Sequence, residues 1–104
     1  MKSFYAMQRA NGDWFAVDDN GCLRMLIFKS SGEAMMARSR DSGMECFKPV
    51  AFDTRAFKEF KMTEGDRASF LIVADSSRNV KRGLRLNFTE LAPLLIDFAE
   101  GKAK

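Results

Sequence analysis

The chain has 104 residues, a length that suits one domain with a single core. Hydrophobic residues make up 46% of it and charged residues 30%, a composition that excludes a disordered or fibrous protein. No apolar run is long enough to span a membrane, and the first residues lack the hydrophobic region of a secretory signal. We therefore expect one globular domain over residues 1–104 in the cytoplasm, with a frayed tail over residues 100–104.

The positive charge is concentrated in one part of the sequence. The chain has 17 Lys and Arg against 14 Asp and Glu, a formal net charge of +3. Residues 76–86 contain no acid and four cations, which are Arg78, Lys81, Arg82 and Arg85. A segregated patch of this kind steers an acidic partner, whereas evenly spread charge mainly favours solubility. The alternative explanation is a solvated turn between two strands.

The first part of the chain, residues 4–28, predicts three short strands separated by two turns. Each turn contains Asn-Gly, the strongest short hairpin signal, because type I′ turns need a positive φ at both central positions. Two hairpins make a three-strand antiparallel meander. The third strand becomes apolar on both faces towards its end, which indicates a central strand covered on both sides.

A helix is predicted over residues 32–43, preceded by serines that can cap its N-terminus and ended near Gly43. We expect its methionines to fill the core rather than to form a binding groove. Residues 44–50 then predict a strand in which Pro49, without an N–H group, belongs at an edge or at the strand's exit.

Asp53 is expected to cap a second helix over residues 54–61, whose phenylalanines point inward together. Residues 68–74 form a continuous apolar run typical of a buried strand, and residues 83–88 alternate as a half-buried strand does. A third helix is expected over residues 89–101, beginning close to Pro93.

The element order is therefore β-β-β-α-β-α-β-β-α. It predicts an α+β fold with a single, mainly antiparallel sheet and helices packed against it. Short connections and two hairpins favour antiparallel neighbours, while the connection through the first helix is compatible with one parallel pair in that sheet.

The residues that usually carry catalysis are missing. With no histidine, a general base would have to be another side chain with a shifted pKa. No nucleotide-binding or hydrolase motif occurs, and neither cysteine belongs to a metal-ligand pair. We expect Cys22 and Cys46 to be free, buried, structural thiols. The sequence predicts no metal, no cofactor and no catalytic residue, so an enzyme is only a third hypothesis.

The leading hypothesis is a non-enzymatic protein-interaction module. Its basic patch, Arg78, Lys81, Arg82 and Arg85, would recognise an acidic protein partner. The alternative is a nucleic-acid-binding domain that uses the same cations together with exposed aromatic side chains, for which Trp14 and Tyr5 are the candidates. Self-association through an edge strand, giving a homodimer, is also expected to be possible.

Three segments carry a resemblance to known proteins: residues 27–30, the pattern PVxxDxxxFxxF at residues 49–60, and "GLRLNFTELAPLL" at residues 83–95. With these segments, residues 13–98 resemble small bacterial domains of unknown function, and their ending is similar to that of the N-terminal domain of SseB-type proteins. Lys29 stands where the group has proline. The resemblance implies a small α+β cytoplasmic bacterial protein that acts as an interaction module, and it carries over no catalytic residue.

Overall fold

The computed structural model describes residues 4–40, 42–64, 69–74 and 82–103. Its strands are β1 (Tyr5–Arg9), β2 (Ala16–Asp19), β3 (Cys22–Ile27), β4 (Phe47–Ala51), β5 (Ser69–Val73) and β6 (Gly83–Asn87). Its helices are α1 (Ser31–Arg40), α2 (Thr54–Glu64) and α3 (Phe88–Ala103), with a short 3-10 helix η1 (Ser42–Met44) after α1. The element order predicted from the sequence is confirmed.

The described strands form two sheets, so the prediction of a single sheet is wrong. One sheet has the order β2-β3-β5-β6, in which β3 and β5 are parallel and the other neighbours are antiparallel. The other is the antiparallel pair of β1 and β4. The mainly antiparallel α+β class is confirmed, and the parallel pair arises because the chain crosses over through α1, β4 and α2 between β3 and β5.

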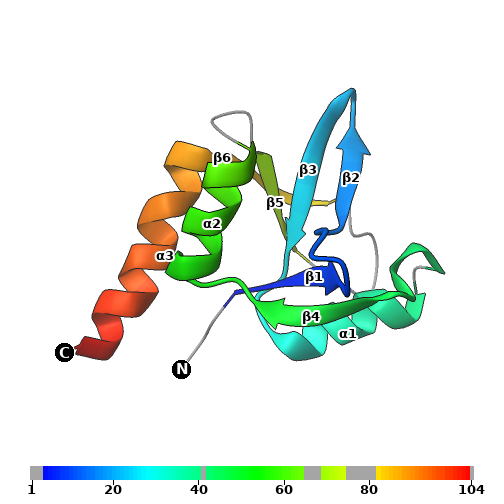
Figure 1. Cartoon of the computed structure of the whole chain (residues 1–104), viewed down its shortest axis with the longest axis horizontal. Coiled ribbons are helices and arrows are strands. Elements are labelled where there is room, and N and C mark those ends of the chain that lie inside the picture. Colours follow the sequence, from blue (N-terminus) through cyan, green and yellow to red (C-terminus); the bar gives the residue numbers. More distant parts are fainter. Residues whose placement is uncertain (1–3, 41, 65–68, 75–81, 104) are drawn as a thin grey trace.

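β1 lies where the two sheets meet, and its two edges are paired to different extents. On one edge it pairs with β4 along its whole length, from Tyr5↔Ala51 to Arg9↔Phe47. On the other edge it is attached by the isolated bridges Tyr5↔Phe28 and Gln8↔Trp14. The predicted meander is therefore complete only in the β2–β3 hairpin, and Figure 1 shows β1 and β4 running across the end of β3.

The β2–β3 turn has the predicted chemistry. Asn20 and Gly21 both have a positive φ, of 55° and 87°, as a type I′ turn requires. The Asp18 carboxylate accepts a hydrogen bond from the Gly21 amide at 2.9 Å. The hairpin is thus fixed locally by its own turn residues.

α1 and α2 begin at side chains that were predicted as caps, and α3 begins at a cap that was not predicted. The Glu33 amide donates to the Ser30 hydroxyl at 3.1 Å, and the Ala56 amide donates to the Asp53 carboxylate at 2.9 Å. At α3, Asn87 and Glu90 form a reciprocal capping box with two bonds of 2.9 Å. This box starts α3 ahead of Pro93, which lies inside the helix, and α3 runs to Ala103 within the tail expected to fray.

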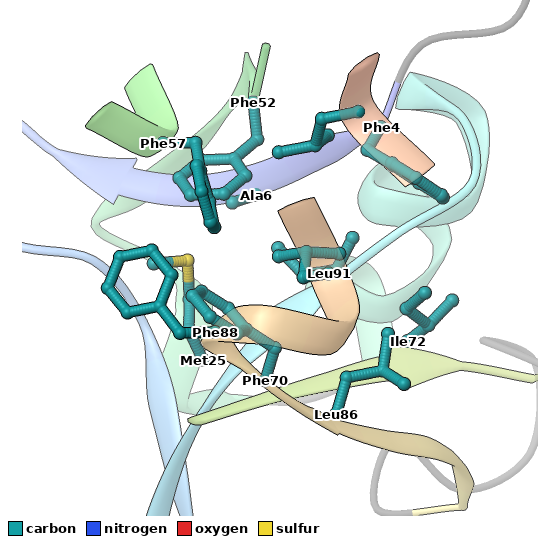
Figure 2. Packing of buried hydrophobic residues seen from close by; sticks show 12 residues of the cluster. Phe4, Ala6, Met25, Phe52, Phe57, Phe70, Ile72, Leu86, Phe88 and Leu91 are labelled. Atoms are coloured by element: carbon teal, nitrogen blue, oxygen red, sulfur yellow. The ribbon is translucent and has the colours of Figure 1, made fainter. Parts of the chain in front are cut away.

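The strand layer separates two apolar clusters. The first lies under α2 and α3 and is rich in aromatic rings, which Figure 2 shows converging from strands and helices. Its buried members are Phe4, Ala6, Met25, Ile27, Phe52, Phe57, Phe70, Ile72, Leu86, Phe88, Leu91 and Leu95. The second lies on the side of α1, and its buried members are Met7, Leu26, Phe28, Ala34, Ala37, Met44, Leu71 and Val73.

The prediction for the methionines of α1 is wrong. Met35 and Met36 are 42% and 45% exposed, whereas Ala34 and Ala37 are fully buried. Small side chains let α1 lie close to the β1–β4 ladder, and the longer methionines are left on the outer face of the helix.

Candidate protein-binding groove

The four cations of the predicted basic patch are only partly placed by the structure. Arg78 and Lys81 lie outside the described residues. Arg82 is exposed directly before β6, where its carbonyl accepts a hydrogen bond from the Ala74 amide at 3.0 Å. Arg85 lies on β6, opposite Leu71 of β5.

Arg85 forms an ion pair with an aspartate of the same chain. Its Nε and Nη2 donate to the two carboxylate oxygens of Asp19 at 2.6 and 3.2 Å. Arg24 Nε donates to the same carboxylate at 2.8 Å. Part of the positive charge expected for a partner is thus matched by a carboxylate of the same chain, one whose side chain is only 12% exposed.

The two guanidinium groups lower the pKa of Asp19. The hydrogen bonds from Arg85 are the largest cause, partial burial opposes them, and the bond from Arg24 adds to the lowering. The pKa of Asp19 in the folded protein therefore lies below its ordinary value of 3.8.

This shift predicts a pH-dependent contribution to stability. The contribution is fully present above pH 3.8 and is lost as the pH falls through the lower pKa of folded Asp19. We expect Asp19→Asn to lower the free energy of unfolding at pH 7, and we expect the difference from wild type to shrink in strong acid. Urea denaturation at several pH values measures this, with Glu45→Gln as a control for removal of one exposed carboxylate. Parallel stability profiles for wild type and Asp19→Asn would contradict the role of the ion pair.

Trp14 and Tyr5 do not form one stacking surface. Trp14 is half-buried against the first cluster, with its ring 5.4 Å from that of Phe52. Tyr5 is half-buried against the second cluster, on the other side of the strand layer, together with Phe15. Trp14 and Phe15 belong to different clusters because successive side chains of an extended segment point to opposite faces.

A wide groove of about 840 Å³ opens beside Trp14. It lies between α2, the β2–β3 hairpin and the turn that precedes β2, and we call it the Trp14 groove. Among the described residues, its apolar lining consists of Trp14, Ala16, Leu23, Met25, Phe47, Ala56 and Phe60. Asp13, Glu59 and Arg9 provide its charges.

Local structure explains how these residues meet. On α2, Ala56, Glu59, Phe60 and Thr63 line the groove at i, i+3, i+4 and i+7, which is one stripe of a helix. On β3, Leu23 lies on the same face as Met25, because side chains two apart share a face of a strand. Met25 is 2% exposed, whereas Leu23 is 69% exposed, so the helices cover only part of this face.

The charged side chains that line the groove differ in how strongly other residues of the chain engage them. Asp13 and Glu59 are exposed carboxylates from two different elements, the turn before β2 and α2. The Arg9 guanidinium lies over the Phe47 ring, 5.4 Å from its centroid. Arg55 pairs with Glu59 at 3.7 Å, but both side chains are at least 70% exposed, so this pair is weak.

The groove was not predicted from the sequence. Phe60 was predicted to point into the core, and the structure leaves this side chain half-buried at the groove wall. The strand that contains Leu23 was predicted to be covered on both sides. No local signal marks either residue as accessible, because the accessibility of both side chains depends on how α2 packs against the sheet.

The two cysteines are free, as expected. Cys22 is half-buried, and its thiol lies 3.6 Å from the Ser69 hydroxyl. The expectation of a buried Cys46 is wrong. This thiol is exposed, because β4 begins only at Phe47 and leaves Cys46 in the preceding turn.

Searched over the part of the chain that the structure describes, no group of three or more His, Cys, Asp or Glu side chains could hold a metal ion. Among the same residues, no helix combines the length and apolar character needed to cross a membrane.

Comparison with known proteins leaves the geometry as the basis for a functional assignment. Neither a protein-family model, nor a curated protein, nor a solved structure matches this chain.

Proposed function

We propose that the protein is a non-enzymatic interaction module that binds another protein in the Trp14 groove. The observation that carries this proposal is the exposure of Leu23, which is 69% accessible on a face of β3 where the next two side chains, Met25 and Ile27, are buried. Together with half-buried Trp14 and Phe60 it forms an apolar surface inside a concavity. Apolar surface gathered in this way, rather than scattered singly, marks an interaction site.

The basic stretch takes second place in this proposal. The ion pair of Arg85 with Asp19 supplies a structural reason for one of its cations. The separation of Trp14 from Tyr5 removes the aromatic platform that the nucleic-acid hypothesis used. The resemblance to small bacterial domains and a cytoplasmic location stay predictions, and two free cysteines fit a reducing compartment.

Self-association through an edge strand also stays a prediction, and two edges carry features that discourage it. On β4, Pro49 pairs with Met7 in the middle of the strand, at a position whose nitrogen faces away from β1. That outer edge therefore lacks one N–H group. On β2, pairing with a second copy would bring Asp18 of both copies close together. Sedimentation at high protein concentration tests for a dimer.

The proposed function is tested by capture from cell lysate with wild-type protein and Leu23→Glu. Leu23 is exposed, so a glutamate there leaves the fold intact and places a charge on the apolar surface. We expect capture of the partner to fall at least about fivefold, as for a residue that contributes more than ~1 kcal/mol to an interface. Met35→Glu, at an exposed methionine of α1, is the matched control and should retain the partner.

Two results would count against this function. Equal capture by wild type and Leu23→Glu would mean that the groove is not the binding site. Loss of all captured material on nuclease treatment, together with loss in Arg82→Glu, would favour the nucleic-acid alternative.

A further inference from the structure

The chemistry of the Trp14 groove restricts the partner further, on the assumption that the proposed function is correct. The groove needs an apolar side chain to cover its floor, because Trp14 and Phe60 are half-buried and Leu23 stands above them in solvent. Burial of such surface contributes roughly 25 cal/mol per Å² of apolar area removed from water. A purely polar partner would gain nothing from this floor.

The walls add a requirement for positive charge. Asp13 and Glu59 are exposed, and they line the groove from two different elements, the turn before β2 and α2. Arg9, the cation of the lining, is directed onto the Phe47 ring. Within the described ranges, the ion pair of the Glu59 carboxylate is an exposed contact of 3.7 Å with Arg55, so the carboxylate can accept hydrogen bonds from a second cation.

The same charges argue against two other occupants. Phosphates of a nucleic acid would be repelled by Asp13 and Glu59. A second copy aligned along β2 would add a second exposed Asp18 to an edge that already carries one.

We infer that the Trp14 groove binds a segment of a partner protein that places an apolar side chain against Trp14 and Phe60 and a lysine or arginine between Asp13 and Glu59. The apolar contact supplies most of the affinity, and the cation selects the partner and its orientation.

The test uses a display library of random short peptides, selected on the full chain. Trp14 is the single tryptophan of the protein, so its fluorescence reports directly on occupation of the groove. We expect selected peptides to carry Lys or Arg next to an apolar residue. Asp13→Asn and Glu59→Gln should each weaken binding about two- to fivefold, as exposed ion pairs do. Glu45→Gln is the matched control and should bind as wild type does.

Replacing the peptide's cation with norleucine completes a double-mutant cycle. The effect of Glu59→Gln should disappear with the norleucine peptide if the two groups interact. Added salt should weaken binding to wild type more than binding to the Asp13→Asn, Glu59→Gln double variant.

Three outcomes would overturn the inference. Groove-binding peptides that lack a cation, or that bind the amide variants as tightly as wild type, would refute the cation requirement and leave the proposed function standing. Selected peptides that bind Leu23→Glu as tightly as wild type would refute both. A dimer abolished by Leu23→Glu would assign the groove to a second copy instead.

Discussion

Phe70→Ala is expected to lower the free energy of unfolding by about 3–5 kcal/mol, the usual cost of truncating a buried phenylalanine. Phe70 is fully buried on β5, at the centre of the first cluster. Its ring centroid lies 6.1 Å from those of Phe52 and Phe57, 5.7 Å from that of Phe60 and 5.9 Å from that of Phe88. Truncation therefore removes contacts to α2, to the start of α3 and to the segment after β4 at once.

Urea denaturation followed by far-UV circular dichroism and by Trp14 fluorescence measures this loss. Because an ordinary domain is stable by only about 5–15 kcal/mol, much of the variant protein could be unfolded at 37 °C. Leu84→Ala is the control, since Leu84 lies on the same face of the neighbouring strand but is 56% exposed. It should cost less than about 1 kcal/mol. Similar losses in the two variants would contradict the central position of Phe70.

Gly83→Ala is expected to have the second largest effect, at least about 2 kcal/mol. Gly83 begins β6, and a Cβ atom there would collide with the backbone carbonyl of Ile72 on β5. The same atom would lie 3.0 Å from the amide nitrogen of Ala74. Backbone atoms of a paired strand cannot move aside as the end of a flexible side chain can, so the start of the β5–β6 ladder must open.

Gly12→Ala separates this collision from the cost of backbone conformation. Gly12 has a φ of +97°, but a Cβ atom there meets nothing within 4 Å. Its replacement should cost only about 1–2 kcal/mol, from the left-handed conformation. Denaturation of both variants, with hydrogen exchange of the β5 and β6 amides, measures the difference. A smaller loss for Gly83→Ala than for Gly12→Ala would contradict the close approach.

Local sequence signals were sufficient for the order of the elements but not for all of their boundaries, since α3 begins at Phe88 and not close to Pro93. Ser30 and Asp53 cap helices where the sequence predicts caps, and Asn20-Gly21 closes the predicted hairpin. These features depend on residues within four positions of one another, so the energy that decides them is present in the local sequence. Pro49 also behaves as predicted, because a missing N–H group restricts any strand in the same way.

Less of the candidate site could be predicted from the sequence. Arg85 was assigned to a basic surface, yet it pairs with Asp19, 66 positions away in the chain. Trp14 was predicted as a possible aromatic contact, and it does line the groove, but its neighbours there come from β3 and α2. Spacing along the chain contains no information on such pairings.

By itself, the sequence determined the α+β class, the order of the elements, the caps of α1 and α2 and the β2–β3 turn, because each follows from side-chain periodicity or from bonds between near neighbours. Only the tertiary structure decided that β1 pairs with β4, which residues of the apolar runs remain in solvent, and which acid Arg85 meets. These depend on how far α2 extends over the sheet and on contacts between distant segments, and the exposed Leu23 beside Trp14 results from that packing.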